Sequence, residues 1–281
     1  MIGSYEDYLQ FMMNQRIYLK DKPTCTISPE HVDWSTNKSF GQIELKANIN
    51  GPICPEKYFE NKLHLLFYLR EPYIKPDSWD CGDRGGHKQS TDYGECEYYQ
   101  ICNSTYKNII KFTYFFINML NGIKMNESDF TGHENEAIEL FRNHVCIINA
   151  CWFPHTGSTN AIVSRCIGWL LKNDSIFKQM NQLFTPTVII GAGVLKPQWD
   201  CESDNFTMFG LVREGFITPM EILSMTNFQL APKDDHTFLM SDGKIYANTY
   251  HPQIFKPYET ANSIYKLLNQ HSNGKIDWEI R

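Results

Sequence analysis

Three short apolar runs constrain the fold of this chain most strongly. They are residues 64–69 (HLLFYL), 145–148 (VCII) and 187–190 (TVII). None of them alternates between apolar and polar residues, so we expect each to form a strand with both faces buried. Strands of this kind are typical of parallel sheets covered by helices on both sides. A more polar run, 244–248 (KIYAN), is the fourth strand candidate.

Candidate helices separate these strands. They are residues 106–120, 160–171, 175–184 and 258–270, the last of which follows Pro257. The alternation of strands and helices predicts an α/β fold with right-handed crossovers. The expected architecture is a three-layer sandwich, in which helices flank a central, mostly parallel, four-stranded sheet.

The beginning of the chain has a different pattern. Residues 4–20 carry apolar side chains at helix-like spacing, and a polar stretch with turn-forming residues follows. We therefore expect residues 1–60 to form a helical extension packed on the core and residues 61–281 to form the α/β domain. Within that domain, the polar and glycine-rich segment 75–97 has the length of a functional loop.

Composition and charge limit the classes of function. No apolar run is long enough to cross a membrane, and the first residues are acidic where a signal peptide is basic. We expect a cytoplasmic or nucleoid-associated protein that is neither secreted nor membrane-bound. The net charge of −6 argues against nucleic-acid binding by bulk electrostatics, but it allows a few local phosphate contacts. The nine cysteines include no C-x-x-C pair, so reduced cysteines are favoured over a metal centre.

Chemically distinctive residues follow each strand candidate. Glu71-Pro72-Tyr73 comes after the first strand and Asn149 after the second. Gly191-Ala192-Gly193 comes after the third strand, and His251-Pro252-Gln253 follows the fourth. In such sheets, ligands bind beyond the carboxyl ends of the strands. We therefore expect a carboxylate, an amide, a glycine pair and a histidine to converge at one edge.

Taken in this order, the four motifs resemble those of the uracil-DNA glycosylase superfamily, over roughly residues 62–270. The resemblance implies a monofunctional glycosylase that flips a uracil or modified pyrimidine out of DNA and hydrolyses its glycosidic bond. It implies a product with an abasic site and no metal or cofactor. The expected partner is single- or double-stranded DNA, bound by a monomer. Base-excision repair and defence against modified foreign DNA are the two expected roles.

The resemblance also implies a role for each matched residue. Glu71 stands where the family has an aspartate that assists the attack of water at the sugar. His251 is expected to stabilise the departing base by donating a hydrogen bond. Asn149 is expected to read the edge of the base, and Tyr73 to form a wall of its pocket. Phe255 falls at the position of the wedge that enters the vacated base stack.

Further candidates surround these residues. Trp152 and His155 follow the second strand and are candidates for the pocket lining. Gln253 stands where the family has a small serine that contacts a DNA phosphate. Arg84 in the long loop and Lys256 beside the wedge are candidates for other phosphate contacts.

The match to the family is incomplete. Glu71 extends the carboxylate by one methylene, whereas a catalytic geometry tolerates about 0.5 Å of displacement. Gln253 and the long segments 75–97 and 199–242 alter the mouth of the site further. These departures suggest a substrate other than plain uracil, such as a bulkier modified pyrimidine.

The same residues also have ordinary structural explanations. Glu71 can be a solvated carboxylate, Asn149 a cap, and His251 a loop histidine. Phe255 can be a core side chain and Tyr73 a packing residue. Two other functions therefore stay open: a catalytically inactive nucleic-acid-binding module of the same fold, and a small-molecule nucleoside or glycoside hydrolase. The sequence contains no G-x-S-x-G elbow, P-loop or intact dinucleotide fingerprint.

Overall fold

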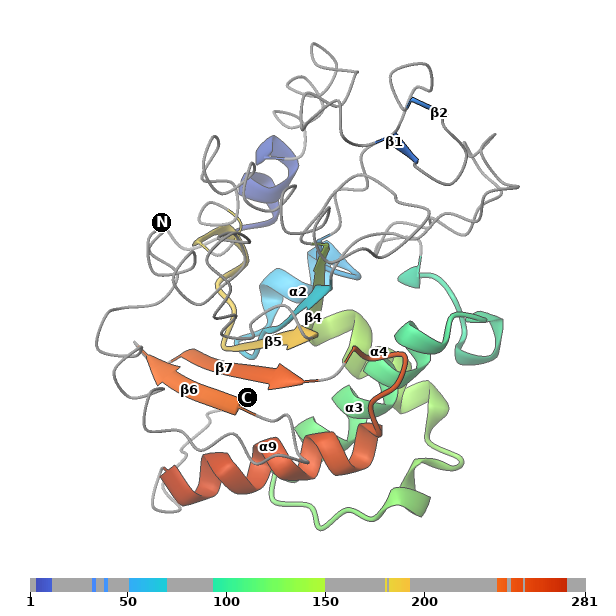
Figure 1. Cartoon of the computed structure of the whole chain (residues 1–281), viewed down its shortest axis with the longest axis vertical. Helices are drawn as coiled ribbons and strands as arrows, with labels where there is room; N and C mark the ends of the chain where they lie inside the picture. The colour runs from blue at the N-terminus through green and yellow to red at the C-terminus, as the bar shows by residue number, and fades with distance from the viewer. Residues whose placement is uncertain are drawn as a thin grey trace.

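The computed structural model describes residues 4–11, 32–33, 38–39, 51–69, 93–149, 180, 182–192, 237–241, 244–249 and 251–271. A five-stranded sheet with the order β4-β3-β5-β7-β6 lies at its centre (Figure 1). The strands are β3 (Leu65–Leu69), β4 (Val145–Asn149), β5 (Val188–Ala192), β6 (Thr237–Ser241) and β7 (Lys244–Thr249). Two further strands of two residues each, β1 (Val32–Asp33) and β2 (Lys38–Ser39), form a separate antiparallel pair.

The sheet is mostly parallel. Strands β4, β3, β5 and β7 run in the same direction, and β6 pairs with β7 in the opposite direction. The predicted α/β class is therefore confirmed, and the four predicted strands closely match β3, β4, β5 and β7. The antiparallel edge strand β6 is an addition that the sequence analysis did not predict.

Both faces of the sheet are buried along β3, along residues 145–148 of β4 and along residues 188–191 of β5. Phe67 of β3 and Ile147 of β4 face the main hydrophobic core, which includes the helices. Leu66 and Tyr68, which point to the opposite face, are buried to the same degree. Burial on both faces explains why the strand segments are apolar throughout, without alternation.

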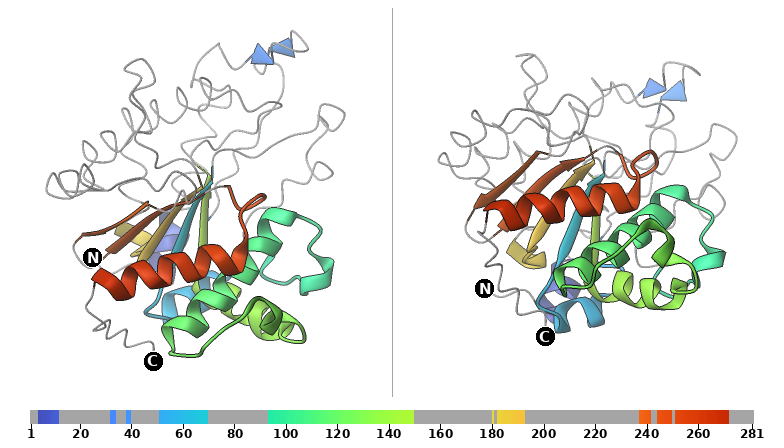
Figure 2. Two further views of the ribbon diagram at one scale, coloured as in Figure 1. Left: turned by 60° about the horizontal axis from the view of Figure 1, so that its bottom comes forward. Right: turned by 90° about the horizontal axis from the view of Figure 1, so that it is seen from below.

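Three helices lie on one face of the sheet (Figure 2). They are α3 (Ser104–Leu120), α4 (Glu134–His144) and α9 (Pro257–His271). Helix α3 packs against both α4 and α9, so most of its side chains are buried. The side chain of Asn103 caps α3 by accepting a hydrogen bond from the N–H of Thr105 at 2.8 Å.

The predicted helices 106–120 and 258–270 correspond to α3 and α9. Residues 180 and 182–184 of the predicted helix 175–184 are helical, and residues 160–171 lie outside the described part of the chain. Helix α4, the short helix α2 (Pro55–Glu60) and the 3₁₀ turns η4 (Tyr98–Gln100) and η5 (Glu127–Phe130) were not predicted. No described helix has both the length and the apolar composition needed to cross a membrane.

Residues 4–11 and 51–60 of the predicted N-terminal extension pack against the rest of the described structure. Residues 5–11 are helical, whereas residues 12–20 lie outside the described part. Tyr8 packs on Phe59 and Phe184, with ring centroids 6.2 and 6.1 Å apart. The N–H of Ile53 donates to the carbonyl of Val145 at 2.9 Å, beside the edge strand β4. Residues 51–60 therefore share the core of the sheet, without a break in packing at residue 60.

Candidate functional site

The four parallel strands end at one edge of the sheet. Leu69 at the end of β3 is paired with Asn149 at the end of β4. Ala192 at the end of β5 is likewise paired with Thr249 of β7. Neighbouring strands are about 4.8 Å apart, so the four strand ends span about 15 Å. The segments that follow these strands therefore all begin at the same edge.

The order of the strands marks one position along this edge. The chain passes from β3 to β4 on one side, and then to β5 on the other side of β3. In open α/β sheets, ligands bind at the carboxyl edge where the direction of winding changes in this way. The space beyond the ends of β3 and β5 is therefore the expected ligand position.

His251 begins a tight turn just after β7. The N–H groups of Ile254 and Phe255 donate to the carbonyl of His251 at 2.9 and 3.2 Å. The backbone N–H of Gln253 donates to Nδ1 of the His251 ring at 3.2 Å. A ring nitrogen that accepts a hydrogen bond carries no proton, so the neutral imidazole of His251 carries its proton on Nε2.

Helix α3 holds this turn at two points. The side chain of Asn108 donates from Nδ2 to the carbonyl of Pro252 at 2.7 Å. The ring of Phe112 packs on that of Phe255, with the centroids 5.9 Å apart. Asn108 and Phe112 are four residues apart in the helix, so they lie on the same face, one turn from each other.

The structure locates Phe255, the predicted wedge, in the hydrophobic core. Phe255 is 5% exposed, whereas its neighbour Ile254 is 68% exposed. The contact with Phe112 turns the larger aromatic ring inward. Ile254 is therefore the apolar side chain that this turn presents at the surface.

Two other predicted contact residues lie in or beside the turn. Gln253 and Lys256 are both exposed. The ammonium of Lys256 lies 2.8 Å from the carboxylate of Glu259, and this hydrogen bond raises the pKa of Lys256. The positive charge of Lys256 is therefore partly balanced by Glu259 in the first turn of α9.

The remaining predicted site residues are at the ends of β4 and β5 or in segments that follow the strands in sequence. Asn149 is the last residue of β4, and its backbone lies at the carboxyl edge of the sheet. Gly191 and Ala192 continue strand β5 instead of forming a turn. Five residues lie outside the described part of the chain: Glu71, Tyr73, Arg84, Trp152 and His155.

Asn108 was not among the site residues predicted from the sequence. Its only signal was an amide near the start of a helix that is rich in apolar residues, in the segment 107–112 (KNIIKF). An amide at such a position can cap the helix, face solvent or bind a distant carbonyl, and the sequence does not distinguish among these.

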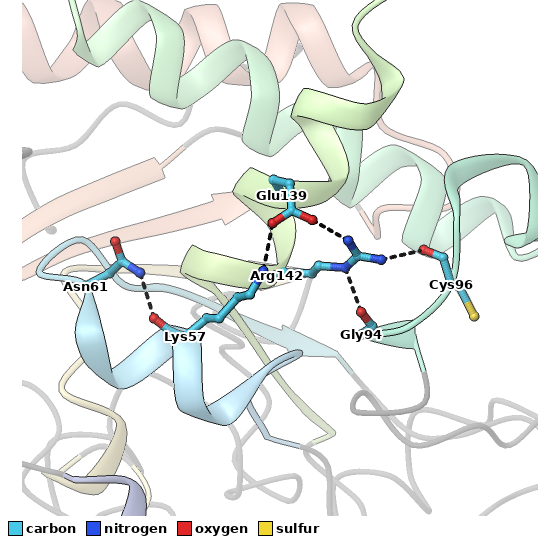
Figure 3. Close-up of polar contacts among 6 residues, drawn as sticks. All are labelled: Lys57, Asn61, Gly94, Cys96, Glu139 and Arg142. Atoms are coloured by element: carbon cyan, nitrogen blue, oxygen red, sulfur yellow. Dashed lines mark hydrogen bonds and ion pairs between the residues drawn. The ribbon is translucent and has the colours of Figure 1, made fainter.

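A second polar cluster lies on α4, away from the turn (Figure 3). Arg142 donates from Nε to the carbonyl of Gly94 at 2.6 Å and from Nη2 to that of Cys96 at 3.4 Å. It also pairs with Glu139, which in turn binds Lys57 of α2 at 2.8 Å. The hydrogen bond from Lys57 and the contacts with Arg142 lower the pKa of Glu139. The cluster joins α2, α4 and the segment 94–96, and we assign it a structural role.

Within the described ranges, no group of three or more His, Cys, Asp or Glu side chains is arranged to hold a metal ion. Comparison with known proteins adds no further assignment. No family model, no curated protein and no solved structure matches this chain. The function must therefore be inferred from the site itself.

Proposed function

We propose that this chain is a monofunctional DNA glycosylase that hydrolyses the N-glycosidic bond of a flipped uracil or modified pyrimidine. The observation that carries the proposal is the His251 turn at the carboxyl edge of the sheet. The hydrogen bond from the N–H of Gln253 to Nδ1 favours the neutral imidazole that carries its proton on Nε2. A departing pyrimidine accumulates negative charge on a carbonyl oxygen, which such an N–H group stabilises.

The reaction breaks the bond between the base nitrogen and C1′ of the sugar. The bonding electron pair leaves with the base, so the sugar acquires positive charge in the transition state. Glu71, which follows β3 in the sequence, stabilises this charge and orients the attacking water. The water oxygen bonds to C1′ and its proton passes to the carboxylate, while the base anion takes a proton from solvent. The reaction requires no metal or cofactor.

Recognition of the base is assigned to residues that follow the other strands. Asn149 reads the edge of the base at the end of β4, and Tyr73 closes the pocket together with Trp152 and His155. Gln253, Lys256 and Arg84 contact the phosphates of DNA around the flipped nucleotide.

We assign the wedge to Ile254 in place of Phe255, because Ile254 is exposed and Phe255 is buried. Flipping costs a few kcal/mol of unstacking, which an inserted apolar side chain partly recovers. Since Ile254 and His251 belong to the same turn, capture of the flipped base and filling of the stack are coupled.

Two broader features complete the proposal. We infer that helices cover both faces of the sheet in a three-layer arrangement, because the face opposite α3 and α9 is also buried. The protein is proposed to act as a monomer on cytoplasmic or nucleoid DNA, in repair or in defence against modified foreign DNA.

A second candidate is a hydrolase of free nucleosides or other small glycosides. The net charge of −6 and the pairing of Lys256 with Glu259 favour it, because both weaken attraction to a polyanion. Such an enzyme uses the same His251 but has no need of an exposed Ile254.

The test is a base-release assay on DNA that contains uracil, a mismatched thymine or a bulky modified pyrimidine, with free nucleosides in parallel. We expect base release and an alkali-labile abasic site with one of the DNA substrates, and their loss in Glu71→Gln. Glu60→Gln, an exposed carboxylate at the end of α2, is the matched control. Release from nucleosides alone would favour the second candidate. Binding of DNA without release would indicate an inactive module.

A further inference from the structure

We infer that Asn108 is a positioning residue of the candidate site, because it holds the carbonyl of the peptide group whose N–H binds Nδ1 of His251. The effect of Asn108 on base release rests on the proposed function. Its effect on the His251 ring does not, and the two can be measured separately.

A single peptide group connects Asn108 to the His251 ring. The carbonyl of Pro252 and the N–H of Gln253 belong to the same planar unit, so they can only rotate together. Asn108 donates to this carbonyl at 2.7 Å, and this N–H donates to Nδ1 of His251 at 3.2 Å. The peptide is therefore held at both ends, by α3 on one side and by the imidazole on the other.

The direction of both hydrogen bonds is fixed by chemistry. A backbone carbonyl can only accept, so the Asn108 amide must present its NH₂ group to Pro252. A backbone N–H can only donate, so Nδ1 of His251 must be the acceptor. Rotation of the peptide would break both bonds at once. It would point a carbonyl toward Nδ1, which favours the opposite tautomer.

Helix α3 is a firm support for this arrangement. Phe112, one turn after Asn108, is fully buried and packs on Phe255 at the other end of the turn. Asn108 itself binds the backbone of the turn, at the carbonyl of Pro252, which is 144 residues later in the sequence. Packing of Phe112 and Phe255 holds the turn near the helix, and Asn108 determines how its central peptide is oriented.

The consequence for the reaction is specific. Without Asn108, the peptide can rotate and a fraction of the molecules no longer present Nε2–H to the base. We expect Asn108→Ala to lower kcat about tenfold, the loss that corresponds to one hydrogen bond, with KM little changed.

The direct test is NMR of the ¹⁵N-labelled histidine rings in the full chain, where a His251→Gln variant identifies the His251 signals. The wild-type ring is expected in the single tautomer with its proton on Nε2. In Asn108→Ala, the ¹⁵N chemical shifts of the two ring nitrogens are expected to move toward each other, because the two tautomers exchange. Asn262→Ala, the same change in the second turn of α9, is the control and is expected to keep the wild-type spectrum.

Asn108→Asp keeps the size of the side chain and removes the donor, so it tests the inference if the alanine variant does not fold. A wild-type His251 with mixed tautomers would overturn the inference, as would either Asn108 variant with the wild-type tautomer. A change of tautomer in a protein that releases no base from any substrate would support the positioning role and contradict the proposed function.

Discussion

At the scale of single residues, the neighbours Ile254 and Phe255 are expected to have different roles, because Ile254 is exposed and Phe255 is buried. Phe255→Ala should destabilise the protein by about 3 kcal/mol or more, because it opens a cavity beside Phe112. Ile254→Ala should change stability by less than about 0.5 kcal/mol, because this side chain is exposed. The same variant should bind DNA with an abasic site several-fold more weakly. Urea unfolding and a binding titration measure the two effects, and equal destabilisation by both variants would contradict the assignment.

Two buried histidines, His64 and His144, lie at the opposite edge of the sheet, directly before β3 and β4. Nε2 of His64 lies 2.9 Å from the carbonyl of Tyr58, and Nδ1 of His144 lies 2.9 Å from that of Leu63. Burial lowers the pKa of both rings from the ordinary value of 6.5, and the proximity of His64 lowers that of His144 further.

This shift has a defined effect on stability. Below about pH 6.5, the unfolded chain takes up protons on these rings that the folded protein does not. The contribution of the two rings to the free energy of unfolding should therefore be complete above this pH. It should be lost as the pH decreases toward the lowered pKa values. His144→Gln should reduce the slope of melting temperature against pH between about pH 7 and 5. An unchanged slope would show that His144 does not contribute to the pH dependence of stability. His133→Gln, which replaces an exposed histidine, is the control.

At the scale of the elements, the cluster on α4 ties together segments that are distant in sequence. Arg142→Met should destabilise by about 1–3 kcal/mol, because the carbonyls of Gly94 and Cys96 lose a charged donor. Lys57→Met should cost less than about 1 kcal/mol, because its pair with Glu139 is half exposed. Urea unfolding of the two variants compares them directly. A larger loss for Lys57→Met would contradict the structural role given to Arg142.

The sequence predicted the elements that have the simplest patterns. Strands β3, β4 and β5 are apolar runs, and α3 and α9 are long helices with clear starts. Helix α4 was missed although Ala137, Ile138 and Phe141 have the spacing of a single buried face. Strand β6 was missed although Asp242-Gly243, a common two-residue hairpin sequence, separates it from β7.

At the scale of the whole molecule, the strand order was beyond the reach of sequence patterns. Apolar runs identify strands, but the neighbours of each strand depend on crossovers between distant parts of the chain. The same limit applies to the candidate site. His251 was predicted from its motif, whereas Asn108, which binds the carbonyl of Pro252 in the same turn, is 144 positions before Pro252 and belongs to another element. The exposure of Ile254 and the burial of Phe255 depend on the same long-range packing.

The most direct test of the central claim is the single-turnover rate of base release by wild type and by His251→Ala. We expect release by the wild type and a loss of about 10²–10³-fold in His251→Ala, the usual effect of removing a donor to a developing anion. His133→Ala, which removes an exposed histidine paired with Glu136, is the control and should keep the wild-type rate. A His251→Ala variant that releases the base at the wild-type rate would contradict the role of His251. Absence of release by the wild type from every pyrimidine substrate would contradict the glycosylase itself.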